Sequence, residues 1–407
     1  MRLPRGFHVL IAAQFFSALA DNALLIVAIA LLAAMQMPGW WAPLLRFAFT
    51  IAYVVLAPVV GALADCGPKA RLMMAMDALK VVGVLLLSWP AHPLLALGVV
   101  GIGAAAYAPA KYGLVTELVG APQLVAANGW IEVSTVCAAL LGTVLGGLLV
   151  SPLLARWAGA VWPGLDPLSL ALRLLLAVYA LAAVLNLGLP DSGASYPRSS
   201  VHPLALLRSF LRAQRQLWAD AEGGLTMAVT TLFWGVAAVL QFAVLRWAID
   251  VLGLTLDRAA YLQGVVAVGI VAGAAGAGRW VALARATRVL PLGITMGLLV
   301  PAVALVDEWM AAVPLLVLVG ALGGALVVPM NALLQHRGHQ LLTAGRSIAV
   351  QNFNENASVL VLLGVYAALL AVDVDIRPLM AGLGLLVALV VAALYLRERR
   401  RLGSATG

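Results

Sequence analysis

Long apolar runs, separated by short breaks of polar residues, proline or glycine, make up most of the 407-residue chain. A helix that crosses the roughly 30 Å hydrocarbon core of a bilayer needs about 20 predominantly apolar residues. The runs that approach this length predict helices over 7–35, 43–64, 72–90, 93–115, 124–150, 168–190, 224–248, 258–283, 288–306, 310–334, 344–371 and 376–396. The pattern therefore predicts an all-α polytopic membrane protein with twelve transmembrane helices.

Composition supports a membrane protein and excludes an ordinary soluble enzyme. Hydrophobic residues make up 64% of the chain and charged residues only 10%, whereas a soluble domain has about 25% charged residues. The net charge is +8. Basic residues placed between apolar helices are typical of orientation in a membrane, so we expect no nucleic-acid partner.

The positions of Lys and Arg predict the orientation. If both termini are inside, the inner connections hold Arg2, Arg5, Lys69, Arg71, Arg198, Arg208, Arg212, Arg215, Arg285, Arg288, Arg337, Arg346, Arg397, Arg399, Arg400 and Arg401. The outer connections hold Arg156 alone. Because loops rich in Lys and Arg remain in the cytoplasm, we expect both termini to be cytoplasmic.

The longest inner connection, 191–223, divides the spans into two halves of six, 1–190 and 224–396, and a basic tail follows at 397–407. A similar offset relates matching residues of the halves: Gly61 with Gly278, Arg71 with Arg288, Gly103 with Gly323, Pro109 with Pro329, Asn128 with Asn352, and Ser134 with Ser358. Two parallel six-helix repeats around a central inner loop are the architecture of major facilitator transporters. We therefore expect two pseudo-symmetric halves with that fold.

The central connection contains a periodic segment. Its three arginines, Arg208, Arg212 and Arg215, share one helical face. The other face holds Leu207, Phe210, Leu211, Gln214 and Leu217. This pattern predicts an amphipathic helix at the inner membrane surface, and the alternative is a solvated linker.

A candidate gate follows the second span, in the string GALADCGPKAR that begins at Gly61. Gly61 allows close helix approach, and Asp65 opposite Lys69 and Arg71 can form a charge-paired latch that breaks when the halves rock. We call these four residues the inner latch. The second repeat keeps Gly278, Arg285 and Arg288 but has Ala282 where the acid would be. An ordinary turn with basic residues is the alternative.

Ionisable groups inside a span cost at least roughly 2.5 to 3.5 kcal/mol, so they pair with one another or line a cavity. Asp77 and Lys80 are three residues apart and can neutralise each other as a structural pair. Asp21 shares one face of the first span with Gln14 and Ser17 and has no base on its own helix. Its partner or polar cavity must lie across the bundle.

Other spans also carry polar faces. Span eleven has a stripe formed by Ser347, Gln351, Asn354, Glu355 and Ser358, for which a structural network is the alternative. Span seven places Thr230, Trp234 and Gln241 on one face. Span four ends in Lys111 and Tyr112. Lys111 can contact an anionic phosphate or extend to the inner interface, and Arg246 has the same two options near the outer end of span seven.

Five strings resemble the bacterial lysophospholipid transporter family of the major facilitator superfamily. They are FSALADNALL from Phe16, GAAAYAPAKYG from Gly103, LFWG from Leu232, VPMNALLQ from Val328 and AVQNFNEN from Ala349. The resemblance implies alternating-access transport of lysophosphatidylethanolamine and lysophosphatidylglycerol from the outer to the inner leaflet of the bacterial inner membrane. It also implies reacylation by a functional partner, an acyltransferase/acyl carrier protein synthetase.

The resemblance also indicates site residues. Asp21, Asn22, Lys111 and Glu355 match polar positions of the family pattern. Some members have an arginine where this chain has Gln241, so Arg246 or Lys111 takes the headgroup phosphate, or the headgroup contact differs. The expected substrate-binding set is Asp21, Asn22, Lys111, Tyr112, Trp234, Gln241, Gln351 and Glu355.

Two rival functions follow from the residues. A membrane-embedded enzyme is disfavoured because the chain has no acyltransferase His-x4-Asp motif and no GxSxG elbow. Cys66 and Cys137 have no metal-ligand spacing, so we expect no catalytic residues, metal or cofactor. A proton-coupled exporter of amphipathic molecules, using Asp21 or Glu355 as the proton carrier, stays open. We expect a monomer that contacts membrane lipids.

Overall fold

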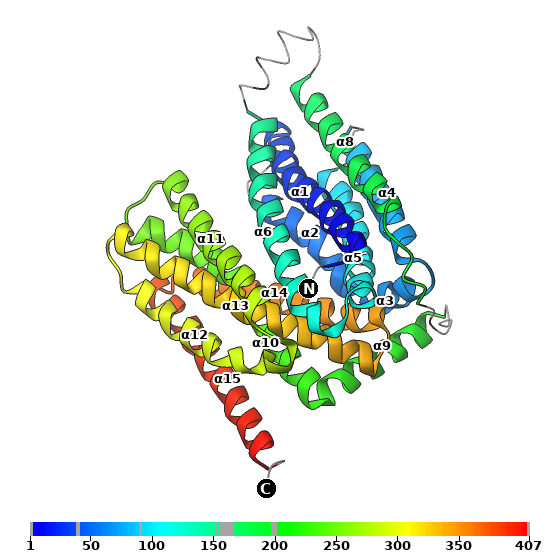
Figure 1. Ribbon diagram of the computed structural model, residues 1–407. Coiled ribbons are helices and arrows are strands. Elements are labelled where there is room, and N and C mark those ends of the chain that lie inside the picture. The colour runs from blue at the N-terminus through cyan, green and yellow to red at the C-terminus, as the bar shows by residue number, and fades with distance from the viewer. Residues whose placement is uncertain are drawn as a thin grey trace. The chain divides into compact units, whose positions relative to one another are not determined.

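The chain is described by a computed structural model for residues 3–37, 41–88, 92–151, 154, 156, 166–194, 196 and 202–404. This part consists of helices and their connections, without strands (Figure 1). The helices up to residue 190 are α1 Arg5–Ala34, α2 Trp41–Val55, α3 Ala57–Asp65, α4 Lys69–Ser88, α5 Pro93–Leu118, α6 Leu124–Leu149 and α8 Pro167–Leu187. The remaining helices are α9 Pro203–Ala219, α10 Ala221–Asp250, α11 Leu256–Trp280, α12 Leu290–Ala304, α13 Trp309–Leu341, α14 Ala344–Ala371 and α15 Ile376–Ser404.

Each predicted span overlaps one or two of these helices, which confirms the helical interpretation of the apolar runs. Among the described residues, ten helices are long and apolar enough to cross a membrane, and α2 with α3 forms an eleventh, bent candidate. The remaining predicted span, 72–90, is α4, which has 20 residues. It is not one of the ten because it carries four charged residues within membrane-spanning length, Lys69, Arg71, Asp77 and Lys80.

The second predicted span, 43–64, is two helices rather than one. α2 and α3 meet at Leu56 with a bend of 63°. Pro58 lies in the first turn of α3. Proline has no backbone N–H, and in a continuous helix its ring would clash with the preceding turn. The proline therefore separates α2 from α3, and α3 ends at Asp65 of the inner latch.

Two helices extend well past the ends of their apolar runs. α13 and α15 continue past the expected ends at 334 and 396, to Leu341 and Ser404. Hydropathy marks only the part of a helix that fits hydrocarbon. Glutamine, arginine and glutamate, which follow these runs, have good helix propensity, so the helices continue beyond it.

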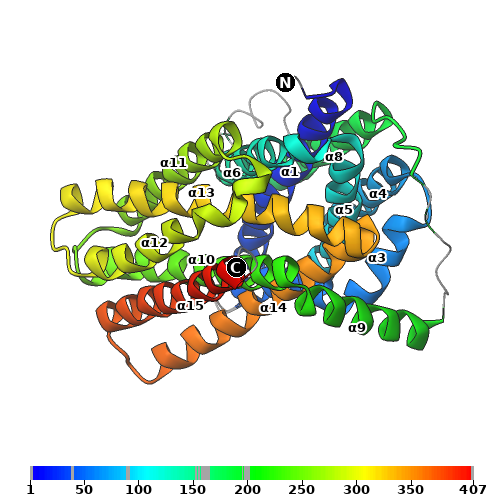
Figure 2. The same ribbon diagram turned by 60° about the horizontal axis from the view of Figure 1, so that its bottom comes forward.

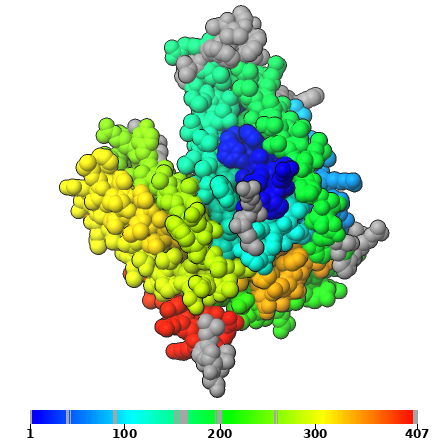
Figure 3. Space-filling model, viewed as in Figure 1, coloured from blue at the N-terminus to red at the C-terminus, as the bar shows by residue number. Residues whose placement is uncertain are grey.

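The helices pack into two compact units. Unit 1 comprises 1–120, 134–216 and 338–353, and unit 2 comprises 121–133, 217–337 and 354–407. On the face drawn in Figure 3, side chains cover the gaps that the ribbons of Figure 1 leave between neighbouring helices. In unit 1 a buried apolar core is formed by α1, α2, α4, α5, α6 and α8. In unit 2 two such cores are formed mainly by α10, α11, α12, α13, α14 and α15.

Candidate functional site

The core of unit 1 encloses a set of hydrogen-bonded polar side chains, which we call the buried cluster. Its members are Ser17 and Asp21 of α1, Asp77 and Lys80 of α4, and Tyr179 and Asn186 of α8. Lys80 Nζ lies 2.8 Å from Asp21 Oδ2 and 2.8 Å from Ser17 Oγ. The Tyr179 hydroxyl donates to Asp21 Oδ1 at 2.7 Å. The base that the first span lacks is therefore provided by α4.

The second carboxylate of the buried cluster has its own partners. Asp77 accepts hydrogen bonds from the Ser17 hydroxyl at 2.7 Å and the Asn186 amide at 2.8 Å. Lys80 Nζ is 3.9 Å from Asp77 Oδ1, farther than from Asp21. The expected ion pair between Asp77 and Lys80 is therefore present, and Lys80 also bridges to Asp21, with which it makes its shorter contact.

Burial distinguishes the three charged groups. The side chains of Asp77 and Lys80 are 0% and 2% exposed, whereas that of Asp21 is 15% exposed. The rings of Tyr107 and Tyr179 lie 5.2 Å and 5.8 Å from Lys80 Nζ, within cation–π range. Asp21 is therefore the most accessible of the three charged groups, and its partner Lys80 is buried.

A second polar chain runs from α1 to α5 and α6. Lys111 Nζ donates to Gln14 Oε1 at 3.2 Å, and Gln14 Nε2 donates to Ser134 Oγ at 2.6 Å. Lys111 Nζ also lies 4.2 Å from the ring centre of Tyr112. The predicted polar face of α1 therefore takes part both in the hydrogen bonds from Lys111 to Ser134 and in the buried cluster. Asn22, next to that face, donates to the Ala18 carbonyl within α1.

Unit 2 holds three of the other predicted site residues. Trp234 on α10 is half-buried and packs edge-on against Phe233 at 5.5 Å, while Gln241 on the same helix is exposed. Glu355 on α14 is half-buried. Arg246, the alternative phosphate ligand, forms a 2.9 Å ion pair with Asp250.

The polar stripe of α14 spans both units. Ser347 and Gln351 are buried in unit 1, and the residues from Asn354 onward belong to unit 2. Asn354 Oδ1 accepts a hydrogen bond from the Trp218 indole at 3.2 Å. The stripe therefore does not lie in one environment, although the spacing puts it on one helical face.

Asp65 of the inner latch contacts the start of α14. Its Oδ1 accepts the Gly345 backbone N–H at 2.9 Å, and its Oδ2 accepts the Thr343 hydroxyl. A carboxylate is favoured at this position because the first N–H groups of a helix lack intrahelical partners and carry partial positive charge. The latch therefore joins α3 to the start of α14 through an N-terminal cap.

The close ion pair of Lys69 is made outside the inner latch, although Lys69 also interacts electrostatically with Asp65. Lys69 forms its ion pair with Glu117 of α5 at 2.6 Å, and Arg71 is exposed. Glu117 also accepts hydrogen bonds from the hydroxyls of Tyr196 and Ser192 at 2.7 Å and 2.6 Å. Burial, the hydrogen bond to Glu117 and the charge of that carboxylate raise the pKa of Tyr196 above its ordinary value.

Gly61 brings α3 close to α14. A Cβ at this position would lie 2.8 Å from Ala349 Cβ and 3.0 Å from Arg346 Cα. Its repeat partner Gly278 is less crowded, since a Cβ there would lie 3.5 Å from the Cα atoms of Ala126 and Gly129 at the start of α6. Each repeat-related glycine therefore faces the beginning of a helix from the other predicted half.

The start of α6, which faces Gly278, has no carboxylate cap of the kind that Asp65 provides, because Ala282 stands where the acid would be. Asn128 of α6 and Gln335 of α13 instead exchange two side-chain hydrogen bonds of 2.9 Å.

A separate carboxylate, Asp220, caps α10. It accepts the Gly223 N–H at 2.8 Å, and it also accepts two hydrogen bonds from Arg337 at 2.9 Å and 2.7 Å.

We expect Arg337→Gln to lower the thermal unfolding midpoint at pH 7 and to have little effect near pH 3. The hydrogen bonds from Arg337 lower the pKa of Asp220, so the stabilisation is present above the unfolded pKa of about 3.9 and is lost as pH falls through the folded value. Thermal unfolding in detergent at both pH values measures the difference. The control is Arg285→Gln, an exposed arginine; an equal loss at both pH values would contradict the prediction.

Sequence reasoning missed several of these contacts. Tyr179, Asn186, Glu117 and Tyr196 stand alone in apolar or linker sequence, and their partners are far away along the chain. No short-range pattern marks them. Among the described residues, no group of His, Cys, Asp or Glu has the arrangement of a metal site.

Comparison with known proteins gives a consistent result. Residues 9–361 match the family model described as Major Facilitator Superfamily. The lysophospholipid transporter LplT of Escherichia coli O7:K1 (strain IAI39 / ExPEC) is 41% identical over 97% of this chain and 96% of its own length. LplT of Shigella dysenteriae serotype 1 (strain Sd197) gives the same identity and shares of each chain.

Solved structures show the same fold at low identity. A bacterial homologue of the iron transporter ferroportin, in an outward-facing state, has a TM-score of 0.72 at 16% identity over 97% of this chain and 99% of its own. The major facilitator transporter FucP, in the outward conformation, also has a TM-score of 0.72 at 16% identity over 97% and 98% of the two chains. The relatives are transporters rather than enzymes, and this multi-pass membrane chain belongs to the lysophospholipid transporter family of the major facilitator superfamily.

Proposed function

We propose that the chain moves lysophosphatidylethanolamine and lysophosphatidylglycerol from the outer to the inner leaflet of the bacterial inner membrane by alternating access, with both termini cytoplasmic. The product would then be reacylated by a separate acyltransferase/acyl carrier protein synthetase. The proposal is supported by 41% identity to transporters named for lysophospholipids and by one feature of unit 1. α1 and α5 hold a partly accessible carboxylate, Asp21, and an ammonium group, Lys111.

These two charges suit a zwitterionic headgroup. Asp21 would accept hydrogen bonds from the amine of an ethanolamine head, and Lys111 would donate to the phosphate, because charge-assisted hydrogen bonds are stronger than neutral ones. Arg246 is a weaker candidate for the phosphate, since Asp250 already pairs with it. Asn22, Tyr112 and Gln351 of unit 1 would add contacts to this headgroup, and Trp234, Gln241 and Glu355 of unit 2 stay predicted substrate-binding residues.

The inner latch would control access from the cytoplasm. Opening there would separate α3 from the start of α14 and break the bonds from Thr343 and Gly345 to Asp65. Lys69 and Arg71 would act less directly: Lys69 fixes the end of α5 through Glu117, and exposed Arg71 adds positive charge at the inner surface. In this scheme Gly61 sets how closely α3 and α14 approach.

The test is uptake of labelled lysophosphatidylethanolamine into spheroplasts that express the wild type, Asp21→Ala or an empty vector, with and without an uncoupler. We expect wild-type uptake above vector and loss of uptake in Asp21→Ala. The control Glu308→Ala alters an exposed loop carboxylate and should transport normally. Uptake at vector level in the wild type would contradict the proposal.

A proton-coupled exporter of amphipathic molecules is the second candidate. Two carboxylates of the buried cluster, Asp21 and Asp77, share the single ammonium of Lys80, so one of them could exchange a proton during transport. Arg46 on α2 also interacts electrostatically with Asp21, which reduces the excess of negative charge in the buried cluster. The uncoupler decides between the two functions: an exporter stops when the pH gradient collapses, whereas facilitated lysophospholipid movement continues.

A further inference from the structure

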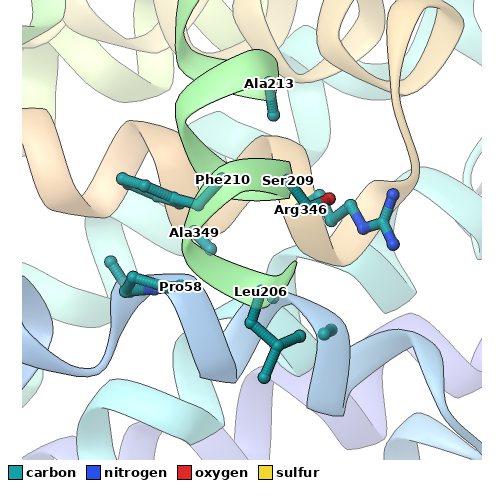
Figure 4. Close-up of a pocket in the computed structure, with 10 residues that line it drawn as sticks. Pro58, Leu206, Ser209, Phe210, Ala213, Arg346 and Ala349 are labelled. Atoms are coloured by element: carbon teal, nitrogen blue, oxygen red, sulfur yellow. The ribbon is translucent and has the colours of Figure 1, made fainter. Parts of the chain in front are cut away.

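The helix between the two predicted halves, α9, has one face packed against other helices of unit 1. Phe210 and Ala213 are buried and, with Leu206 and Ser209, line a small hollow closed by Pro58 of α3 and by Arg346 and Ala349 of α14 (Figure 4). α9 therefore lies beside α3 and the start of α14 (Figure 2). These are the two segments that Asp65 of the inner latch connects.

A second face of α9 is apolar and exposed. Leu204, Leu207 and Leu211 are 57%, 43% and 55% exposed, and Trp218 further along the helix is 39% exposed. At 100° per residue these four side chains fall within one narrow sector of the helix. The packed face lies on the opposite side, so the three leucines of this sector remain exposed, whereas the Trp218 indole also donates a hydrogen bond to Asn354 of α14.

A third face is basic and adjoins the apolar sector. Arg208, Arg212 and Arg215 are all exposed. No ion pair joins any of them to an acid of the described residues, and Arg212 Nε donates only to the Arg208 carbonyl of its own helix. The three positive charges therefore remain available to an external anionic group.

We propose that α9 docks on the anionic cytoplasmic leaflet, with its leucines and Trp218 in the boundary between headgroups and acyl chains and its arginines on lipid phosphates. Helices that bind in the plane of a membrane combine these two faces, and anionic lipid attracts basic residues at the surface. A soluble acidic protein would match the arginines but would not require an aligned apolar sector of this kind. Charge complementarity and the exposed leucines together favour the lipid surface.

Docking would act on the inner latch through direct contacts. Gln216 Nε2 donates to the Leu341 carbonyl at 3.1 Å, and the Phe210 ring packs edge-on against Phe353 at 5.3 Å. These residues flank Thr343 and Gly345, the partners of Asp65. A membrane-bound α9 would thereby hold the segment that Asp65 caps. The docking itself does not depend on which lipid is transported, whereas its effect on gating rests on the proposed function.

The test places a nitroxide at position 211 of the full-length chain. Cys66 and Cys137 are free thiols, so Cys66→Ser and Cys137→Ser precede Leu211→Cys. The purified protein is reconstituted in liposomes of phosphatidylcholine alone or with phosphatidylglycerol. We expect the label to be accessible to oxygen and protected from a water-soluble nickel complex in the anionic liposomes, and less so in phosphatidylcholine. Each neutralised arginine should lower the docking constant about five-fold.

A matched pair of triple variants separates α9 from general charge. Arg208→Gln, Arg212→Gln and Arg215→Gln together should remove the effect of phosphatidylglycerol on the label. Arg397→Gln, Arg399→Gln and Arg400→Gln remove the same charge from the exposed end of α15 and should retain it. Leu204→Cys provides a second label position if the protein labelled at 211 does not fold.

Three results would overturn the proposal. The first is a label equally accessible to the nickel complex in both lipids, and the second is an equal loss in the α15 control. The third is a label that is protected from the nickel complex in native membrane vesicles but not in anionic liposomes that contain only the purified protein. That result would assign the exposed face of α9 to a protein partner. Uptake of lysophosphatidylethanolamine by the same variants is a separate measurement, so a failure of docking can be distinguished from a failure of the transport proposal.

Discussion

Lys80→Met is expected to abolish lysophosphatidylethanolamine uptake and to lower the free energy of unfolding by about 3–5 kcal/mol, the cost of removing one partner from a buried ion pair. Methionine fills a similar volume but leaves Asp21 and Asp77 without the ammonium that lies 2.8 Å and 3.9 Å from them. Neither α1 nor α8 provides a replacement base at these oxygens, since Ser17, Tyr179 and Asn186 are neutral. The measurements are denaturant unfolding in detergent and spheroplast uptake.

A double variant separates stability from transport. Lys80→Gln with Asp21→Asn removes one charge of each sign, so we expect it to recover part of the stability lost in Lys80→Met. It should not recover uptake, because Asp21 is the accessible carboxylate proposed to bind the headgroup. Arg285→Met, an exposed basic residue outside the cluster, is the control for loss of a cation. Normal uptake by Lys80→Met would remove the buried cluster from the mechanism.

The fold could be predicted from the sequence because one physical constraint mainly determines the structure of each apolar run. A segment in hydrocarbon must satisfy its backbone hydrogen bonds internally, so length and hydropathy alone predict a helix. The exceptions have local causes: Pro58 divides the second span, and charged residues make α4 less apolar than its neighbours. The ends of α13 and α15 differ from prediction because helices need not end where hydrocarbon does.

The candidate site was less predictable because its contacts join distant residues. The polar face of α1 predicted that Asp21 has a partner, but spacing favoured Lys80 as the partner of Asp77, only three residues away. In the structure the same ammonium reaches across to α1. Sequence distance likewise suggested that Asp65 pairs with Lys69 and Arg71, whereas the start of α14, 280 residues later, provides its hydrogen-bond donor. The spacing of residues along one helix does not predict which side chains from distant helices lie close to them.

The second large effect is expected for Gly61→Ala in the inner latch. The added Cβ would lie 2.8 Å from Ala349 Cβ and 3.0 Å from Arg346 Cα, so α3 and α14 must separate. Separation would lengthen the bonds that Asp65 accepts from Thr343 and Gly345. Loss of one hydrogen bond to a charged group costs about 1.5 kcal/mol or more, which is about tenfold in the latching equilibrium. We therefore expect faster hydrogen exchange over residues 341–353 and reduced uptake.

Two other glycines make this prediction specific to close packing. Gly67 lies six residues after Gly61 and has no atom within 4 Å of an added Cβ, and the repeat partner Gly278 has its nearest neighbours at 3.5 Å. Gly67→Ala and Gly278→Ala should therefore match the wild type both in hydrogen exchange over residues 341–353 and in uptake. If Gly61→Ala also matches the wild type in both measurements, close approach of α3 to α14 does not control the latch. If all three variants exchange faster, the effect reflects the flexibility of glycine rather than the crowding at Gly61.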